Sequence, residues 1–290
     1  MSTAARLVAH AKLNLLLHVF DRRPDGYHEI GTWYVRLALG DDVMVRVAPG
    51  GRTIDCRGAD VGPPERNLAL RAADAYAGAA RWPKGFAIEI EKRIPVGGGL
   101  GGGSADAAAV LRALDALAPA PLGTARLAAI GARLGSDIPY LVSTHPVAFA
   151  TGRGELLKPM PSLGEAHVAL VCPPFGVATA HAYAWLDADR AAGWQPTLAG
   201  YGNFRGWTSF PRDPSNDLES PVSRRHPEIA RYIQGLRDAG AQSAGMSGSG
   251  STVFGVFDSA PDAASLERSV NAPVVLTQTL ARIDAVHVID

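Results

Sequence analysis

The sequence is poor in cysteine, and this shortage excludes two classes of site. Its 290 residues contain only Cys56 and Cys172. Two cysteines are too few for a disulfide framework, and these two do not have the spacing of metal ligands. Because free cysteine is usually buried, we expect both to be buried thiols.

The chain also lacks an excess of either charge and a long apolar run. Lysine plus arginine and aspartate plus glutamate number 28 each, so nothing favours binding to nucleic acid or to an anionic membrane. No stretch reaches the ~18 consecutive apolar residues of a membrane span, and the first residues do not resemble a signal peptide. We therefore expect a cytoplasmic protein, a monomer or homodimer, whose partner is a small molecule.

What the sequence does contain is a repeated order of predicted elements, strands and then helices. Alternating apolar residues predict an antiparallel meander at 13–19, 33–39, 43–48 and 86–90. Helices are predicted at 67–80 with Asn67 as N-cap, at 104–117 and at 124–134. A second series has strands at 167–171, 252–257, 273–277 and 284–289 and helices at 179–188, 227–238 and 261–271. This order predicts an α+β fold, with a long loop at 189–215.

A glycine block, IPVGGGLGGGSADAAAVL, occupies residues 94–111. It is not a P-loop, because no lysine lies in it or just after it. A dinucleotide fingerprint fits Gly97, Gly99 and Gly102 poorly, since the acids that follow lie on the predicted helix and not at the end of a strand. A flexible linker is rarely joined directly to such a helix start.

The remaining interpretation of this block is a phosphate cradle. Glycine allows positive φ and brings backbone N–H groups close to a ligand, and the N-terminus of the following helix adds its positive dipole end. Ser104 could cap the helix, or bind a phosphate oxygen or a metal. For Asp106, in the first turn, a structural and a functional role remain equally open.

Three further patches carry polar residues suited to chemistry. In AKLNLLLHVFDRRPDGYHEI, residues 11–30, Lys12 and Asn14 alternate on one strand face, and Tyr27 and His28 are able to stack on and hydrogen-bond a planar heterocycle. In LGSDIPYLV, residues 134–142, Asp137 is either an N-cap or a base. MSGSGSTVFGVF, residues 246–257, is a second glycine loop or a simple hairpin turn. Together they form a set suited to phosphoryl transfer.

These motifs, in this order, resemble those of the GHMP kinases. PVGGGLGGGSADAA is similar to the ATP-phosphate loop and MSGSGSTVFGVF to the third motif, while the DGYHE element resembles the branch whose acceptor carries a cytidine diphosphate. Weaker similarities occur at PERNLALRAA, GSDIPYLV, TGRGELLKP and NDLE; residues 189–215 do not align. The resemblance implies two domains, an ATP-binding domain like ribosomal protein S5 domain 2 at 1–160 and a ferredoxin-like domain at 161–290, with the active site between them.

The resemblance also implies a reaction. The γ-phosphoryl group of ATP would pass to the 2-hydroxyl of diphosphocytidyl-methylerythritol, in the non-mevalonate route to isoprenoids, with Mg²⁺ bridging phosphate oxygens. Asp137 would be the base, with Lys12 beside it. The metal ligands stay unknown: Ser104 is a candidate, and a glutamate that some family members use has no clear counterpart.

The same resemblance assigns the binding residues. His28 would read the edge of the cytosine, and Tyr27 and Tyr183 would sandwich the cytosine ring. Thr179 would line the acceptor pocket, and Asn14 would help orient the methylerythritol end. The residues expected at ATP are Asn67 and Lys92 near the adenosine and the loop residues Pro95, Gly97, Gly98, Gly99, Leu100, Gly101, Gly102, Gly103 and Ser104.

Three alternatives remain beside this hypothesis. A related kinase with another acceptor would keep the glycine loops without needing Tyr27, His28 and Tyr183. A non-catalytic relative would be expected to lose Lys12 or Asp137, and both are present. A nicotinamide-dependent oxidoreductase would bind NAD in preference to ATP.

Overall fold

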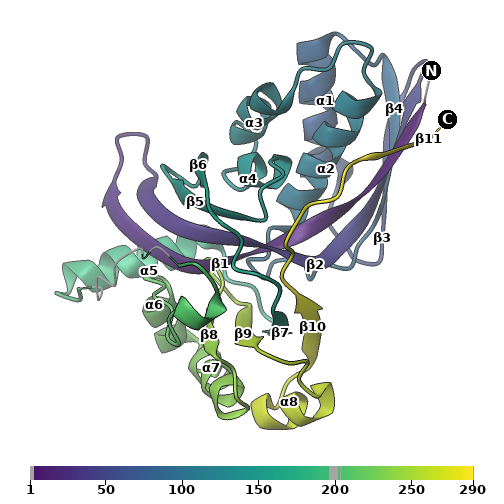
Figure 1. Cartoon of the computed structure of the whole chain (residues 1–290). Coiled ribbons are helices and arrows are strands. Elements are labelled where there is room, and N and C mark those ends of the chain that lie inside the picture. The colour runs from purple at the N-terminus through teal and green to yellow at the C-terminus, as the bar shows by residue number, and fades with distance from the viewer. Residues whose placement is uncertain (1–2, 196–201, 203, 290) are drawn as a thin grey trace.

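A long curved hairpin of two strands runs through the molecule and joins its two halves (Figure 1). The computed structural model describes residues 3–195, 202 and 204–289. The hairpin consists of β1 (Ala4–Arg22) and β2 (His28–Ala48), paired antiparallel with register shifts near Lys12, Asn14 and Val19. Its base packs in the larger core, whereas Leu17, Val19 and Ile30 near its tip pack in the second core.

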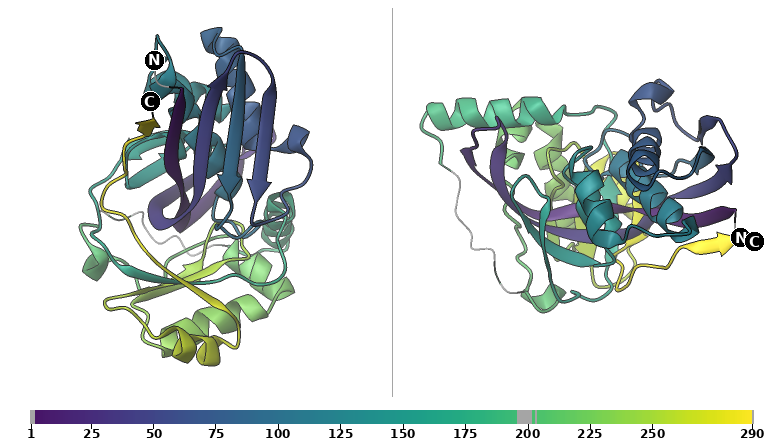
Figure 2. Two further views of the ribbon diagram at one scale, coloured as in Figure 1. Left: turned by 90° about the vertical axis from the view of Figure 1, so that its right-hand side faces the viewer. Right: turned by 90° about the horizontal axis from the view of Figure 1, so that it is seen from above.

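The hairpin is the centre of the first sheet, whose order is β11-β1-β2-β4-β3, with β5 and β6 added beside β2. The other strands of this sheet are β3 (Arg52–Arg57), β4 (Gly85–Glu91), β5 (Val147–Thr151), β6 (Leu156–Pro159) and β11 (His287–Ile289). All pairings are antiparallel except that of β3 with β4. The C-terminal strand thus returns to the N-terminal sheet, and the two termini lie side by side (Figure 2).

Helices cover one face of this sheet (Figure 2). They are α1 (Leu68–Ala80), α2 (Gly102–Leu117), α3 (Thr124–Ala132) and α4 (Ile138–Val142), preceded by the short helix η1 (Pro64–Arg66). The alanines of α2 explain why it can lie between α1, α4 and β1: five of them are buried, and their small side chains allow close approach. This packing fixes the start of α2, and therefore the end of the glycine block.

The second sheet has the order β10-β7-β9-β8 and is wholly antiparallel. Its strands are β7 (His167–Val171), β8 (Ser243–Met246), β9 (Val253–Phe257) and β10 (Val274–Gln278). Helices α5 (Thr179–Ala191), η2 (Trp207–Ser209), α6 (Glu219–Arg225) and α7 (Glu228–Asp238) lie between β7 and β8, and α8 (Ala263–Val270) lies between β9 and β10. This is the ferredoxin-like order that the resemblance to the GHMP kinases implies.

Strands β7, β8 and β9 of the second sheet are buried on both faces, whereas β10 is partly exposed. Val168 and Leu170 of β7 pack in the larger core with the first sheet, while Ala169 and Val171 pack in the second core with the helices. This follows from the alternation of side chains along a strand. The two halves therefore share packed surface, and the junction between them is a defined place for a site.

Several predicted elements need correction. The predicted strands 33–39 and 43–48 are one strand, β2, and the meander is broken by the parallel strand β3. The predicted strand 284–289 is reduced to β11 and belongs to the first sheet. The helices and strands that periodicity did not predict are η1, β3, α4, β5, β6, η2, α6 and β8; none of them is longer than seven residues. Of the predicted loop, α5 extends to Ala191 and η2 forms a short turn, while 196–201 and 203 lie outside the described residues.

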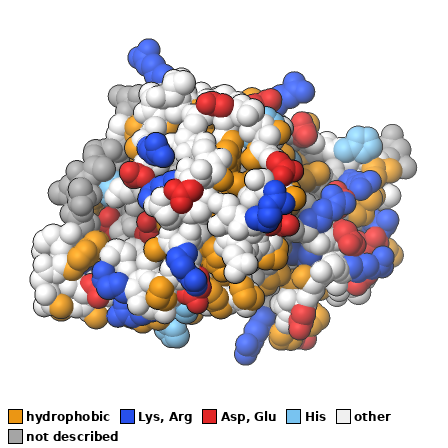
Figure 3. Space-filling model, turned by 90° about the horizontal axis from the view of Figure 1, so that it is seen from below, with side chains coloured by type: hydrophobic (Ala, Val, Ile, Leu, Met, Phe, Trp, Pro, Cys, Tyr) orange, Lys and Arg blue, Asp and Glu red, His pale blue; other side chains and the backbone are white. Residues whose placement is uncertain are grey.

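The surface agrees with the charge balance of the sequence. On the face shown in Figure 3, positive and negative side chains are interspersed. None of the helices in the described ranges is long and apolar enough to span a bilayer. Cys56 and Cys172 are free but only half-buried, so the expectation of buried thiols is wrong. Partial burial still raises the pKa of both thiols.

Candidate active site

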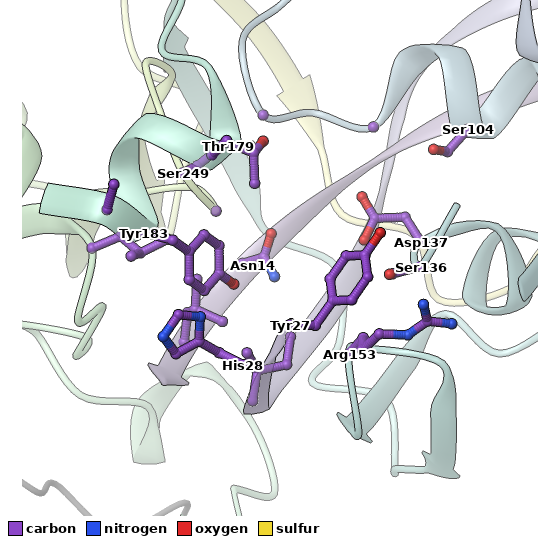
Figure 4. Close-up of a pocket in the computed structure, with 18 of the residues that line it drawn as sticks. Asn14, Tyr27, His28, Ser104, Ser136, Asp137, Arg153, Thr179, Tyr183 and Ser249 are labelled. Atoms are coloured by element: carbon purple, nitrogen blue, oxygen red, sulfur yellow. Dashed lines mark hydrogen bonds between the residues drawn. The ribbon is translucent and has the colours of Figure 1, made fainter. Parts of the chain in front are cut away.

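A cavity of about 720 Å³ lies at the junction of the two halves. It is lined by every residue predicted for catalysis and for the acceptor: Lys12, Asn14, Tyr27, His28, Asp137, Thr179 and Tyr183. Figure 4 shows His28 and Tyr183 side by side at one side of this acceptor cavity and Asp137 with Ser136 at the other. Residues separated by up to 171 positions in sequence are thus brought to one place.

Lys12 and Asn14 point into the acceptor cavity from β1, as their alternation predicts. The Lys12 side chain is 4% exposed, and its Nζ donates to Asn14 Oδ1 at 2.6 Å and to the Gly99 carbonyl at 2.7 Å. Asn14 Nδ2 in turn donates to Thr32 Oγ1 on β2. The ammonium is therefore held between the strand and the glycine block.

Asp137 precedes α4 and does not cap it. Its backbone has helical angles and its side chain makes no capping hydrogen bond, which excludes the N-cap interpretation. Oδ1 accepts a hydrogen bond from the Tyr34 hydroxyl at 2.9 Å, and Oδ2 lies 3.6 Å from Lys12 Nζ. The carboxylate is 29% exposed, so it can meet a ligand in the cavity.

The other side of the acceptor cavity is aromatic. The rings of His28 and Tyr183 are stacked, with centroids 5.1 Å apart. His28 Nε2 lies 2.8 Å from Asp187 Oδ1, and because a carboxylate only accepts, Nε2 carries the hydrogen. Tyr27 is 55% exposed and lies under the guanidinium of Arg153, 4.9 Å from its ring centre. The three predicted rings thus line one cavity, with His28 against Tyr183.

Thr179 lies on the same face of α5 as Tyr183, as its spacing predicts. Its hydroxyl is 3.1 Å from that of Ser249. Ser249 belongs to the loop between β8 and β9, which is therefore both the hairpin turn and a wall of the acceptor cavity.

A second cavity of about 500 Å³ lies on the other side of the glycine block. All the predicted ATP residues line it: Asn67, Lys92, Pro95, Gly97, Gly98, Gly99, Leu100, Gly101, Gly102, Gly103 and Ser104. Gly99, Gly101, Ser104, Thr179 and Ser249 line both cavities. The glycine block thus forms the common wall.

Two glycines show why this wall contains no larger residue. Gly99 has φ 79°, and a Cβ there would come 2.7 Å from the Ser247 carbonyl oxygen. Gly101 has φ 73°, and a Cβ there would meet the Lys12 side chain at 3.1 Å. Both positions therefore need glycine for its left-handed backbone and for close packing.

The predicted alternatives at the helix start can now be separated. α2 begins at Gly102 with Gly101 as N-cap, so Ser104 lies inside the first turn and the capping prediction for it is wrong. Asn67 does cap α1 by accepting from Ala69 N at 2.9 Å. Because Asn67 also lines the second cavity, its two predicted roles are compatible.

Lys92 is buried and paired with two carboxylates. Its Nζ lies 2.5 Å from Asp41 Oδ2 and 2.6 Å from Asp106 Oδ2. Burial lowers the pKa of Lys92, but the two carboxylates outweigh it and the pKa is raised. For Asp106, burial dominates and raises its pKa to about 7, against the opposing effect of Lys92. This buried triad joins β2, the end of β4 and the first turn of α2.

Several side chains of the acceptor cavity were not predicted from the sequence, among them Tyr34, Arg153 and Asp187. Arg153 lies in TGRGELLKP, one of the weaker similarities, which was a usable signal. Tyr34 and Asp187 occupy ordinary positions of a strand and a helix, so their role depends on tertiary contacts alone.

Comparison with known proteins identifies the family. The N-terminal domain of GHMP kinases matches residues 67–152, and the C-terminal domain matches 207–276. A curated protein of Synechococcus sp. strain JA-3-3Ab named 4-diphosphocytidyl-2-C-methyl-D-erythritol kinase is 39% identical over 97% of this chain and 92% of its own. One of the same name from Paracoccus denitrificans is 41% identical over 89% of each chain.

Solved structures give the same result. The crystal structure of a 4-(cytidine 5'-diphospho)-2C-methyl-D-erythritol kinase matches with a TM-score of 0.78 and 36% identity, over 94% of this chain and 98% of the other. Homoserine kinase from Cytophaga hutchinsonii matches with a TM-score of 0.68 over 100% of this chain and 98% of the other, but at 16% identity it shows the fold alone. The chain therefore belongs to the GHMP kinases, in the group whose curated members are named 4-diphosphocytidyl-2-C-methyl-D-erythritol kinase.

Proposed function

We propose that this protein transfers the γ-phosphoryl group of ATP to the 2-hydroxyl of 4-diphosphocytidyl-2-C-methyl-D-erythritol, a step toward isoprenoid precursors. One observation in this structure supports the proposal independently of the names of the related proteins. The acceptor cavity has a Lys12–Asp137 pair at the glycine block and a cluster of aromatic rings at its far side. An acceptor with a reactive alcohol at one end and a flat heterocycle at the other matches this division.

In the proposed reaction, the protein supplies position and charge. The hydroxyl oxygen forms a bond to the γ-phosphorus, the bond from that phosphorus to the oxygen of ADP breaks, and the hydroxyl proton passes to Asp137 Oδ2. Lys12, 3.6 Å from that oxygen, stabilises negative charge on the transferred group. Asn14 fixes the ammonium by accepting from it, and such preorganised charge is a main source of rate in phosphoryl transfer.

Recognition of cytosine is proposed for His28. In the tautomer whose Nε2 hydrogen is donated to Asp187, the ring offers Nδ1 as an acceptor for the exocyclic amine of cytosine. Tyr183 and the exposed ring of Tyr27 offer flat surfaces for the base. The hydrogen bond to Asp187 therefore fixes Nε2 of His28 as the donor and leaves Nδ1 as the acceptor.

The nucleotide is proposed to lie in the second cavity. Backbone N–H groups of the glycine block and the N-terminus of α2 favour phosphate oxygens there. Asn67 and Lys92 also line this cavity, and we place the adenosine near them. Because Lys92 Nζ is engaged by two carboxylates, its contribution to binding is through the shape of the loop more than through free charge.

The residues fit a magnesium ion that arrives with the nucleotide. The described residues contain no group of three or more His, Cys, Asp or Glu side chains placed so that they could hold a metal ion. Mg²⁺ at nucleotide sites keeps several water and phosphate ligands and needs few from the protein, and the Ser104 hydroxyl lies on the common wall of both cavities as one such donor. When bound, the ion would neutralise phosphate charge.

Turnover of the purified protein with ATP tests this proposal. ADP release is measured by a coupled assay, and the position of the new phosphate by phosphorus NMR. We expect turnover with 4-diphosphocytidyl-2-C-methyl-D-erythritol and little with mevalonate or homoserine. A preference for either of those acceptors would instead identify a related GHMP kinase with a different substrate.

A further inference from the structure

Tyr34 touches both members of the Lys12–Asp137 pair. It lies on β2, is 1% exposed and lines the acceptor cavity. Its hydroxyl donates to Asp137 Oδ1 at 2.9 Å, and its ring centre is 5.8 Å from Lys12 Nζ. The contact with Asp137 joins residues 103 positions apart in the sequence, so it depends on the fold of both segments.

The ring of Tyr34 is held in one orientation. It is stacked on Tyr140 with centroids 4.8 Å apart and planes at 17°. Its hydroxyl also packs closely on Gly154, where a Cβ would come within 2.7 Å of the phenolic oxygen. A side chain fixed in this way is able to restrain the carboxylate that it contacts.

The hydroxyl of Tyr34 has a single direction of donation. Burial raises the pKa of Tyr34 well above its ordinary value, and Asp137 adds to the effect. The phenol therefore keeps its hydrogen throughout the neutral range. A carboxylate can only accept, so Tyr34 is the donor to Oδ1, and Oδ2 is the oxygen turned toward Lys12 and the cavity.

We propose that Tyr34 is a positioning residue for phosphoryl transfer, which occupies one oxygen of Asp137 so that the other faces the acceptor hydroxyl. This inference rests on the proposed function. The alternative is a purely structural role, in which Asp137 only accepts the hydrogen bond of a buried tyrosine. The two differ in what is lost when only the hydroxyl is removed: the rate of transfer in the first case, and only folding stability in the second.

Tyr34→Phe separates them, because the ring keeps its contacts with Tyr140 and Lys12. We expect kcat to fall about tenfold, the scale of one hydrogen bond to a charged group, with KM for ATP and for the acceptor changed less than about twofold. Tyr140→Phe is the matched control. It removes a buried hydroxyl that donates to the Pro146 carbonyl, outside the acceptor cavity, and should leave kcat unchanged.

A double-mutant cycle tests whether Tyr34 acts through Asp137. A purely structural role for Tyr34 would not make its effect on kcat depend on Asp137. If Tyr34 acts through Asp137, then Tyr34→Phe should have little further effect on kcat in the Asp137→Asn background. Independent, multiplicative losses, or wild-type kcat in Tyr34→Phe, would overturn the inference while leaving the function intact. A wild-type protein that does not phosphorylate the cytidyl acceptor would overturn the proposed function and this inference together.

Discussion

Asp106→Asn should remove a pH dependence of folding that the buried triad creates. Asp106 is 3% exposed and shares Lys92 with Asp41. Asp41 has further support, since Oδ1 accepts from the backbone N–H groups of Arg93 and Ile94. Asp106 is therefore the carboxyl group that takes up a proton, and its pKa is raised to about 7, chiefly by burial.

The sign of the effect follows from this raised pKa. In the unfolded chain Asp106 loses its proton near the ordinary pKa of 3.8, so between about pH 4 and pH 7 the folded protein binds a proton that the unfolded chain does not. The stability from this group is complete below pH 4 and is lost as the pH rises through 7. Each pH unit in this window is worth at most about 1.4 kcal/mol, and the whole window about 4 kcal/mol.

Urea unfolding from pH 4.5 to 8 measures this dependence. The free energy of unfolding of wild type minus that of Asp106→Asn should fall with rising pH, because all other titrating groups are common to both proteins and cancel. Val110→Ala, a truncation of a fully buried side chain on the same helix, is the control, and should lower stability by the same amount at every pH. Parallel curves for wild type and Asp106→Asn would refute the reasoning.

Three further predictions concern the site. Asp137→Asn should keep ATP and acceptor binding but lose at least ~10²-fold in kcat, the scale of a general base; near-normal turnover would refute the assignment of Asp137 as the base. His28→Ala should raise KM for the cytidyl acceptor about five- to tenfold, the value of one hydrogen bond, with KM for ATP unchanged, and equal increases in both would argue against cytosine reading. Gly99→Ala should destabilise the fold by about 1–3 kcal/mol through its positive φ and weaken ATP binding. Gly103→Ala is its control, as a Cβ there meets nothing closer than 3.8 Å; equal melting temperatures of the two variants would contradict the prediction.

The parts of the site that could be predicted from the sequence are those with local causes. A dense run of glycine indicates positive φ and close backbone approach, and Gly99 and Gly101 show both. Alternation along a strand placed Lys12 and Asn14 on one face, and helix spacing placed Thr179 with Tyr183. In each case, neighbours in sequence decide the geometry.

The supporting side chains could not be predicted, because their partners are distant in sequence. In the sequence, Tyr34 looks like one more apolar residue of a buried strand. Only the packing of α4 beside β2 brings its hydroxyl within hydrogen-bond distance of Asp137. Asp41 reads as a polar residue in the middle of the second hairpin strand, yet it is fully buried beneath the glycine block. The prediction that Ser104 caps α2 was wrong for a different reason: the helix starts two residues earlier than the sequence indicates.

The two buried lysines beside the glycine block have different roles: Lys92 is structural, and Lys12 belongs to the proposed chemistry. Lys92 has two carboxylates within 2.6 Å, so its charge is fully balanced and serves to hold β2, β4 and α2 together around the loop. Lys12 has one carboxylate, whose Oδ2 lies 3.6 Å away and whose Oδ1 accepts a hydrogen bond from Tyr34. Its remaining bonds go to the neutral oxygens of Asn14 and Gly99. The less compensated cation is therefore the one on the wall between the two cavities, where the proposed transfer develops negative charge.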